Sequence, residues 1–349
     1  MVALNFTLQH LIALSDDVGI LQHADFDVPN RAEGYCTDDV ARAFIVVVRA
    51  AGHEIERTEA LRLGRIYLAF LRHAQLPDGR FHNFMSYART WLDDAGGEDS
   101  IGRAIWALGF GMLRAPLDGW RRQCAQSLER AAPHVLSFEY PRPRALAALG
   151  LADAFEAYGR TGPLEITLRS LGTDLVARLA QAGSPDWRWF EPELTYDNAR
   201  LPEALLRIGT VLQDPTFVEA GLETLAFYES IVVEDGTFVP IGNDGWYVGG
   251  GSRARYAQQP LEAAALVDAA LAAEAATGRA TYRRLAECAF AWYHGRNSEG
   301  AVMTLNGGCC DGLEEHAVNP NMGAESTLSY LASALSLARA KAEPLRAVR

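Results

Sequence analysis

Two adjacent carboxylates, Asp38 and Asp39, stand directly before an apolar run in residues 34–48, GYCTDDVARAFIVVV. A helix N-terminus favours negative charge because its first N–H groups have no partner within the helix, and Asp is a good N-cap. A cap needs only one carboxylate, however, and here an arginine follows three residues after the second. Two interpretations therefore stay open: one of the pair caps a helix, and at least one of them takes part in chemistry.

Other carboxylates in similar contexts suggest which chemistry. Hydrolysis of a glycosidic bond needs two carboxyl groups with separated pKa values, one protonated and one ionised. Glu325, in NPNMGAESTLSYL, is the first candidate acid, because no Lys or Arg is near it in sequence and burial would raise its pKa. Its alternative role is a capping arrangement with Ser326. Glu191 is a second candidate acid, and Asp39 or Asp197 is the candidate base, acting through a water molecule.

Aromatic residues gather in the loops that carry these acids. A sugar ring stacks its C–H face on an aromatic ring and offers its hydroxyls to carboxylates, amides and Arg. Because successive side chains of an extended segment point to opposite sides, Trp187 and Trp189 share one side, where we expect them to stack on sugar. We expect Phe81 and Phe84 to pack down as satellite core. The expected catalytic residues are Glu325, Asp39, Asp197, Glu191 and Asp38. The expected substrate-binding residues are Tyr35, Asp99, Arg103, Arg142, Trp187, Trp189, Tyr196, Asn198, Arg200, Trp246, Gln259, Asp311, His316 and Asn321.

The elements that position these residues are helices, because the dominant hydrophobic period is helical. We predict helices at 4–14, 37–51, 58–74, 99–115, 117–136, 142–158, 163–181, 197–211, 214–231, 259–276, 280–297 and 323–339. Short and long connections alternate between them. The even-numbered helices open with polar residues and continue with small apolar ones, as inner helices should. The odd-numbered helices carry one apolar stripe and one charged face, as an outer layer should.

This repeat of a helical hairpin, six times over, predicts an all-α fold: an (α/α)6 toroid forming a single domain over residues 1–349. An open helical solenoid has the same repeat logic and is the alternative. In the toroid all long loops lie at one end, some of them, notably 234–251, holding short strands. The N-termini of the inner helices then point into one bowl, which brings the distant acids together.

Composition excludes several other classes of function. The net charge of −12 argues against binding to nucleic acid, and no apolar run is long enough for a membrane span. The first residues do not form a convincing signal peptide. Five cysteines without framework spacing indicate a reducing compartment, so we expect a cytoplasmic protein.

The cysteines and the glycine-rich run form weaker patterns. Cys309 and Cys310 precede several acids and His316, but their spacing matches no closed zinc pattern, so we expect a turn-rich active-site loop and no metal. Cys36 is interpreted as a small, half-buried thiol rather than a nucleophile. The run VGGGSRARY, with Arg253 and Arg255, could hold an anion, and a phosphate there would make the enzyme a phosphorylase. No nucleotide or dinucleotide motif is present, and no cofactor is expected.

With these residues in hand, the chain resembles the (α/α)6-toroid carbohydrate-active enzymes. The segments GYCTDDVARA, WFEPELTYDNARLPEALL, QQPLEAAALVDA and GAESTLSYL also resemble a bacterial glycosidase-like group often encoded beside, or fused to, glycosyltransferases. The resemblance implies sugar handling and a glycosyltransferase as a partner. The epimerases of this superfamily use inner-helix histidines, which the six helix openings here lack. The glucuronyl hydrolases need positive charge for a substrate carboxylate, which Arg103, Arg142, Arg144 and Arg200 offer.

The sequence therefore predicts a glycoside hydrolase that acts on an oligosaccharide, with inversion. Two alternatives remain: a non-catalytic sugar-binding or scaffold partner of a glycosyltransferase, and an inverting phosphorylase. The separation of the carboxyl groups distinguishes inversion from retention, and the sequence does not give it.

Overall fold

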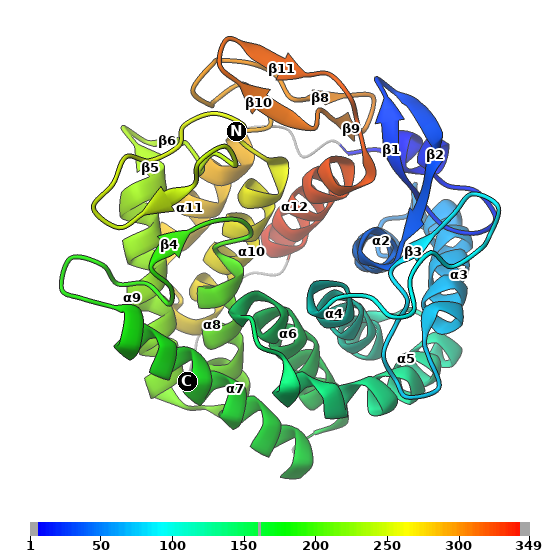
Figure 1. Cartoon of the computed structure of the whole chain (residues 1–349), viewed down its shortest axis with the longest axis horizontal. Coiled ribbons are helices and arrows are strands. Elements are labelled where there is room, and N and C mark those ends of the chain that lie inside the picture. Colours follow the sequence, from blue (N-terminus) through cyan, green and yellow to red (C-terminus); the bar gives the residue numbers. More distant parts are fainter. Residues whose placement is uncertain (1–5, 160–161, 343–349) are drawn as a thin grey trace.

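Two concentric rings of helices make up the computed structural model, which describes residues 6–159 and 162–342 (Figure 1). The inner ring consists of α2 (Thr37–Ala50), α4 (Glu98–Arg114), α6 (Pro141–Tyr158), α8 (Arg200–Leu212), α10 (Pro260–Thr277) and α12 (Ala324–Ala342). Around them lie α3 (Arg57–Ala74), α5 (Asp118–Ala131), α7 (Gly162–Ala182), α9 (Pro215–Val232), α11 (Ala280–Ala291) and α1 (Gln9–Leu14). Neighbouring inner helices contact one another in order, and α12 contacts α2. The ring is closed, so the (α/α)6 toroid is confirmed and the open solenoid is wrong.

The predicted helix bounds differ from the structure in four places. The helix predicted at 117–136 ends at Ala131 and continues as the 3₁₀ helix η1 (Ala132–Ser137), because proline at position 133 cannot continue an α-helix. The helix predicted from 197 begins at Arg200, since Asp197 has a φ of +48°. The helix predicted at 280–297 ends at Ala291. The helix predicted at 4–14 begins at Gln9, and residues 4 and 5 of that prediction lie outside the described residues.

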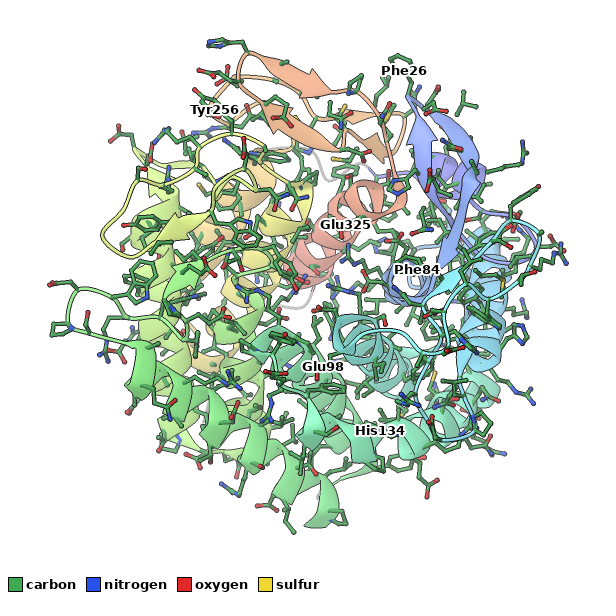
Figure 2. The ribbon with its side chains drawn as sticks, viewed as in Figure 1. Phe26, Phe84, Glu98, His134, Tyr256 and Glu325 are labelled. Carbon is green, nitrogen blue, oxygen red and sulfur yellow. The ribbon has the colours of Figure 1, made fainter. Side chains whose placement is uncertain are left out.

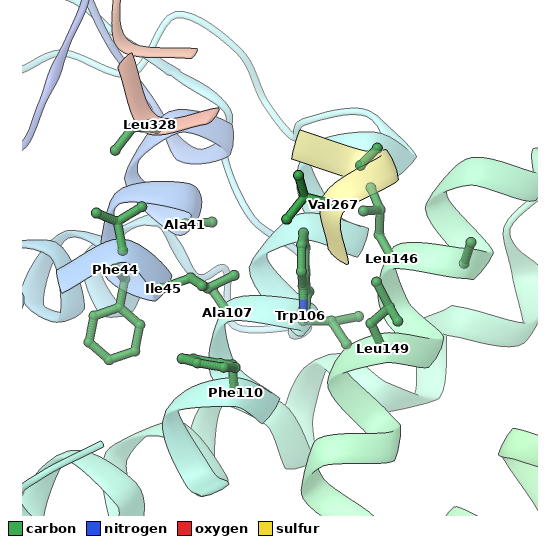
Figure 3. Close-up of a cluster of buried hydrophobic side chains, with 14 of the residues drawn as sticks. Ala41, Phe44, Ile45, Trp106, Ala107, Phe110, Leu146, Leu149, Val267 and Leu328 are labelled. Atoms are coloured by element: carbon green, nitrogen blue, oxygen red, sulfur yellow. The ribbon is translucent and has the colours of Figure 1, made fainter. Parts of the chain in front are cut away.

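Small residues let the inner helices approach one another closely. A Cβ atom added to Gly109 of α4 would lie 1.9 Å from the carbonyl oxygen of Gly150 on α6, so only glycine fits there. The same helices bury large apolar side chains, including Phe44, Trp106 and Leu149 (Figure 3). Burial of this surface is the main favourable term that holds the ring together.

Short antiparallel strands occupy the long connections that lead into inner helices. The strands β1 (Leu21–Asp25), β2 (Val28–Cys36) and β3 (Phe84–Met85) form one sheet. The two-stranded pairs are β4 (Glu193–Leu194) with β7 (Tyr247–Val248), β5 (Val233–Glu234) with β6 (Thr237–Phe238), β8 (Thr304–Leu305) with β9 (Gly308–Cys309), and β10 (Gly312–Glu314) with β11 (Ala317–Asn319). The expectation of short strands within 234–251 is confirmed. Among the described helices, none is both long and apolar enough to cross a bilayer.

Candidate active site

The N-terminus of α2 is capped by neither aspartate of the pair. Cys36 is the N-cap residue: its backbone is extended, and its Sγ accepts a hydrogen bond from the N–H of Asp39. Asp38 and Asp39 both lie in the first turn, where the helix dipole favours negative charge. The capping interpretation of the pair is therefore wrong, and both carboxylates are left for other partners.

Arg42 joins carboxylates from the first and last inner helices. One of its terminal nitrogens lies 3.0 Å from Asp38 Oδ2, and the other forms a very short ion pair with Glu325 Oε2. Because both acids bind the same planar guanidinium, their bound oxygens are at most about 8 Å apart. The Glu325 side chain is 40% exposed. The expectation that Glu325 is buried without a basic neighbour is wrong, since its partner comes from a helix far away in sequence.

Asp39 lies behind this pair and has a different environment. It is 7% exposed, and the Cys36 thiol donates a hydrogen bond of 3.2 Å to its Oδ2. Burial raises the pKa of Asp39 to about 7; Arg42 opposes the shift, and the negative charges of Asp38 and Glu325 add to it. Near neutral pH a large fraction of Asp39 is therefore protonated, while Asp38 and Glu325 beside it are bound to Arg42.

A second arginine, Arg103, links this cluster to Asp197. Arg103 is ion-paired with Asp38, and its Nη2 donates to Asp197 Oδ2 at 3.1 Å. Arg200 lies 3.3 Å from the other oxygen of Asp197. Burial opposes ionisation of Asp197, but Arg200 and Arg103 outweigh it and keep its pKa below the usual value. Asp197 is therefore ionised, and each of its two carboxylate oxygens binds an arginine, which argues against its expected role as base.

The left-handed backbone at Asp197 is held by a buried glutamate. Glu262, which is 2% exposed, accepts hydrogen bonds from the Asp197 N–H, from Asn198 Nδ2 at 3.2 Å and from the Tyr228 hydroxyl at 2.9 Å. Burial, followed by the charge of Asp197, raises the pKa of Glu262 to about 7. Glu262 and Asn198 thus fix the loop before α8 rather than face a ligand.

On the opposite wall, Glu191 is bound by Arg142 at 2.6 Å. The Arg142 guanidinium also lies over the ring of Tyr196, 4.9 Å from its centroid, and the Tyr196 hydroxyl donates to Asp99 Oδ2 at 3.2 Å. Burial raises the pKa of Asp99. The Glu191 carboxyl therefore binds Arg142, and its expected role as the acid stays a prediction.

A cavity of about 30 Å³ lies on the ring axis beneath these groups. By volume it holds about two water molecules. Its polar lining consists of Arg42, Arg49, Arg103, Asp197, Arg200, Asp268 and Ser329. Arg200 continues the network downward through Glu203 at 2.6 Å and Asp268 at 3.0 Å.

The two tryptophans expected to stack on sugar face the protein core. Trp189 is fully buried and its ring stacks on Tyr228 at 5.7 Å. Trp187 packs edge-on against Phe227 at 5.3 Å and donates its indole N–H to the carbonyl of Glu191. Both tryptophans contact Phe227 of α9, so they do share a side, but that side is the interior. Sugar stacking by Trp189 is therefore wrong.

Phe81 and Phe84 differ from each other. Phe81 is fully buried, as expected, but Phe84 is 45% exposed. The expectation that Phe84 packs as satellite core is wrong.

Two further expected binding residues lie elsewhere. Tyr35 is 1% exposed and donates its hydroxyl to Asp16 at 2.6 Å, so it belongs to the packing of β2. The His316 side chain is 81% exposed in the turn between β10 and β11, and its nearest partner is Glu299 at 3.4 Å. Neither contacts the carboxylate cluster, and both expectations are corrected.

The loop before α12 is held by Asp311. Its Oδ1 accepts hydrogen bonds from the Gly323 N–H at 2.8 Å and the Ser326 hydroxyl at 2.7 Å. Ser326 therefore serves Asp311 and not Glu325, against the capping alternative. Asn321 Oδ1 accepts from the Phe26 N–H at 2.9 Å, which ties this loop to the tip of the β1–β2 hairpin.

Two other expected residues, Gln259 and Trp246, are half-buried. Gln259 is the N-cap residue of α10 but makes no side-chain capping bond. Trp246 packs against the core and donates to Asn243 Oδ1 at 3.1 Å.

The arginines expected to bind anions already have acidic partners. Arg144 pairs with Asp174 at 3.3 Å, on the outer side of α6. Arg253 and Arg255 both bind Glu234, so the glycine-rich run does not present free cations to a phosphate. In the part of the chain that the structure describes, no group of three or more His, Cys, Asp or Glu side chains is placed to share a metal ion.

Several polar residues in the centre were missed from the sequence, among them Arg42, Glu203 and Asp268. Arg42 follows Asp38 at the i, i+4 spacing of a helical ion pair, and that signal could have identified it. Glu203 and Asp268 are charged residues within otherwise apolar inner helices, a pattern that also marks a buried polar network.

Solved structures share this architecture. The chain has the (α/α)6-toroid fold of known carbohydrate-active enzymes. A cellobiose 2-epimerase from Bacillus thermoamylovorans has a TM-score of 0.74 at 10% identity, covering 97% of this chain and 96% of its own. A sugar epimerase from a ruminal bacterium has a TM-score of 0.71 at 11% identity, covering 94% of both chains. A GH76 α-mannanase from Bacteroides thetaiotaomicron has a TM-score of 0.68 at 11% identity, covering 96% of this chain and 94% of its own.

The resemblance inferred from the sequence is thereby confirmed at the level of the fold. No protein-family model and no curated protein matches the sequence.

Proposed function

We propose that the bowl is the active site of a glycoside hydrolase that cleaves an oligosaccharide with inversion. The observation that carries the proposal is the cluster around Arg42, which binds Asp38 and Glu325 while Asp39 beside them has a pKa of about 7. Two carboxyl groups whose environments push their pKa values apart are the requirement of glycosidic acid–base catalysis.

The roles follow from charge and exposure. Glu325 is the most exposed acid of the Arg42 cluster, so water reaches it most readily, and it is the proposed base that activates water. Asp39 keeps a proton near neutral pH and is the proposed acid, which donates through its small exposed edge to the leaving oxygen. These assignments reverse the roles expected from the sequence.

Inversion is supported by the space around Arg42. Inverting enzymes separate their carboxyl groups by about 6.5–9.5 Å to admit a water molecule, whereas retaining enzymes need about 5–5.5 Å. The Arg42 guanidinium binds both Glu325 and Asp38, and the limit of about 8 Å between their bound oxygens is compatible with the wider spacing. In the proposed step, Glu325 takes a proton from water, the water oxygen bonds to the anomeric carbon, and the glycosidic bond breaks as Asp39 protonates the departing oxygen.

A sugar epimerase or isomerase is the second candidate, because the structures that share the fold include cellobiose 2-epimerases and a D-mannose isomerase. The resemblance noted from the sequence implies that such epimerases use inner-helix histidines. None of the six inner helices, over their described residues, contains a histidine. The hydrolase is therefore favoured.

Isotope labelling separates these possibilities. The protein is incubated with di- and trisaccharides of glucose and mannose in H₂¹⁸O, and in parallel in D₂O. A hydrolase places ¹⁸O on the new reducing end, whereas an epimerase leaves the chain length unchanged and exchanges a carbon-bound hydrogen for deuterium. Shortened, ¹⁸O-labelled products support the proposal, and deuterated products of unchanged length would overturn it. If calorimetry instead detects saccharide binding without any product, the protein is a sugar-binding module. Turnover that requires added phosphate would identify a phosphorylase.

A further inference from the structure

Phe84 is an exposed aromatic residue held beside the carboxylate cluster. It forms β3 with Met85, and its ring is 45% exposed even though the rest of the short strand is buried. Figure 2 shows Phe84 over α2, with Glu325 on the neighbouring α12. Single exposed apolar side chains are ordinary on a protein surface, so it is the position of Phe84 next to the acid cluster that distinguishes it.

The strand register shows which face the ring occupies. Phe84 is paired with Cys36 across the β2–β3 ladder, and directly opposed residues project to the same face. The Cys36 thiol contacts Asp39. Tyr35, the next residue along β2, points to the other face, where it packs against Phe70. Phe84 therefore stands on the face of the sheet that carries the acid cluster.

The same register provides an internal comparison. Tyr87 lies three residues after Phe84 and is also 45% exposed, but its ring stacks on Tyr35 at 6.3 Å. It thus belongs to the opposite face of β2. Phe84 and Tyr87 have the same exposed fraction but lie on opposite faces of the sheet.

Backbone hydrogen bonds fix the Phe84 segment to the start of α2. The Asn83 carbonyl accepts from the Thr37 N–H at 2.8 Å, and Asn83 Oδ1 accepts from the Asp38 N–H at 3.4 Å. Asp93 accepts from the N–H groups of Asn83 and Phe84, at 2.7 and 3.2 Å. A ring held this way loses little entropy when a ligand stacks on it.

We propose that Phe84 is the stacking platform for a pyranose ring bound next to the sugar whose bond is cleaved. The proposal rests on the proposed function in one respect, that the bowl takes an oligosaccharide. The C–H face of the pyranose covers the exposed phenyl ring, and its hydroxyls lie within reach of the polar groups at the start of α2. The substrate class is then an oligosaccharide with at least one pyranose on each side of the reacting bond.

Calorimetry with cellotriose, mannotriose and maltotriose tests the platform independently of turnover. Phe84→Ala should weaken binding of the probe that the wild-type protein binds best by about tenfold. Phe84→Trp should retain that affinity, and Tyr87→Ala, matched in exposure but on the other face, should leave it unchanged. Thermal unfolding midpoints of all three variants should stay near the wild-type value, because both rings are exposed.

The outcomes distinguish the platform from the hydrolase. Wild-type affinity in Phe84→Ala, an equal loss in Tyr87→Ala, or no binding of any probe by the wild-type protein would overturn the platform. Binding that depends on Phe84 without hydrolysis supports the platform while the hydrolase fails. Hydrolysis that is indifferent to Phe84 removes the platform and leaves the hydrolase standing.

Discussion

Glu325 and Arg42 form an ion pair across 283 positions of sequence, and this contact joins the last inner helix to the first. The ring closes where the acid of one helix meets the arginine of another. Arg42 also binds Asp38, so a single guanidinium holds both carboxylates in position. The proposed chemistry depends on this contact.

Removing either proposed catalytic carboxyl should abolish turnover and leave the fold intact. Glu325→Gln and Asp39→Asn keep the shape of each side chain but cannot exchange the proton, so each should lower kcat by about 10²–10⁴-fold. Steady-state kinetics on a substrate found by the labelling experiment measures this. Glu315→Gln is the control, since Glu315 is an exposed carboxylate outside the cluster. Full activity in both variants would show that the assignment is wrong.

Activity should fall as the pH rises through about 7. Asp39 must be protonated to act as the acid, and its pKa is raised from 3.8 to about 7, chiefly by burial. The basic limb of the kcat/KM profile of the free enzyme should therefore have a midpoint near pH 7. In Asp39→Asn the residual activity should lose this limb. A limb that persists unchanged in the variant would assign the titration to another group.

Conformational stability should also decline over the same range, and Glu262 should account for part of that decline. The pKa of Glu262 is 4.5 in the unfolded chain and about 7 in the folded one. The folded state therefore binds more protons between these values, and the stabilisation that is complete below pH 4.5 is lost as the pH rises through 7. Denaturant unfolding from pH 5 to pH 8 should show a smaller decline for Glu262→Gln than for the wild type. Equal declines would contradict the buried position of Glu262.

Trp189 should matter for stability and not for sugar contact. Trp189→Ala empties a fully buried site against Tyr228, which should lower the free energy of unfolding by about 3–5 kcal/mol. At a temperature where the variant remains folded, its saccharide affinity should equal that of the wild type. A selective loss of affinity with little loss of stability would restore the sugar-stacking interpretation.

The sequence predicts the fold well because the fold depends on local patterns. Helical periodicity, the small residues at Gly109 and Gly150, and the alternation of short and long connections all reflect contacts between neighbouring elements. The errors at the helix ends have local causes as well: proline at position 133 changed one helix into a 3₁₀ turn, and the left-handed backbone of Asp197 delayed another.

The site is only partly predictable because its electrostatics are not local. The sequence places Asp39, Asp197 and Glu325 around one bowl, and the structure brings all three within the field of Arg42. The partner of Glu325 comes from another helix, however, so the sequence neighbours of Glu325 did not reveal its ion pair with Arg42. Alternation correctly paired Trp187 with Trp189 but did not reveal that their shared side faces α9.

The most direct test of the account is the anomeric configuration of the first product. Proton NMR, recorded during hydrolysis before mutarotation, compares the configuration of the released reducing sugar with that of the cleaved bond. The arrangement of Glu325 and Asp39 around Arg42 predicts the opposite configuration. Release of the same configuration would contradict it.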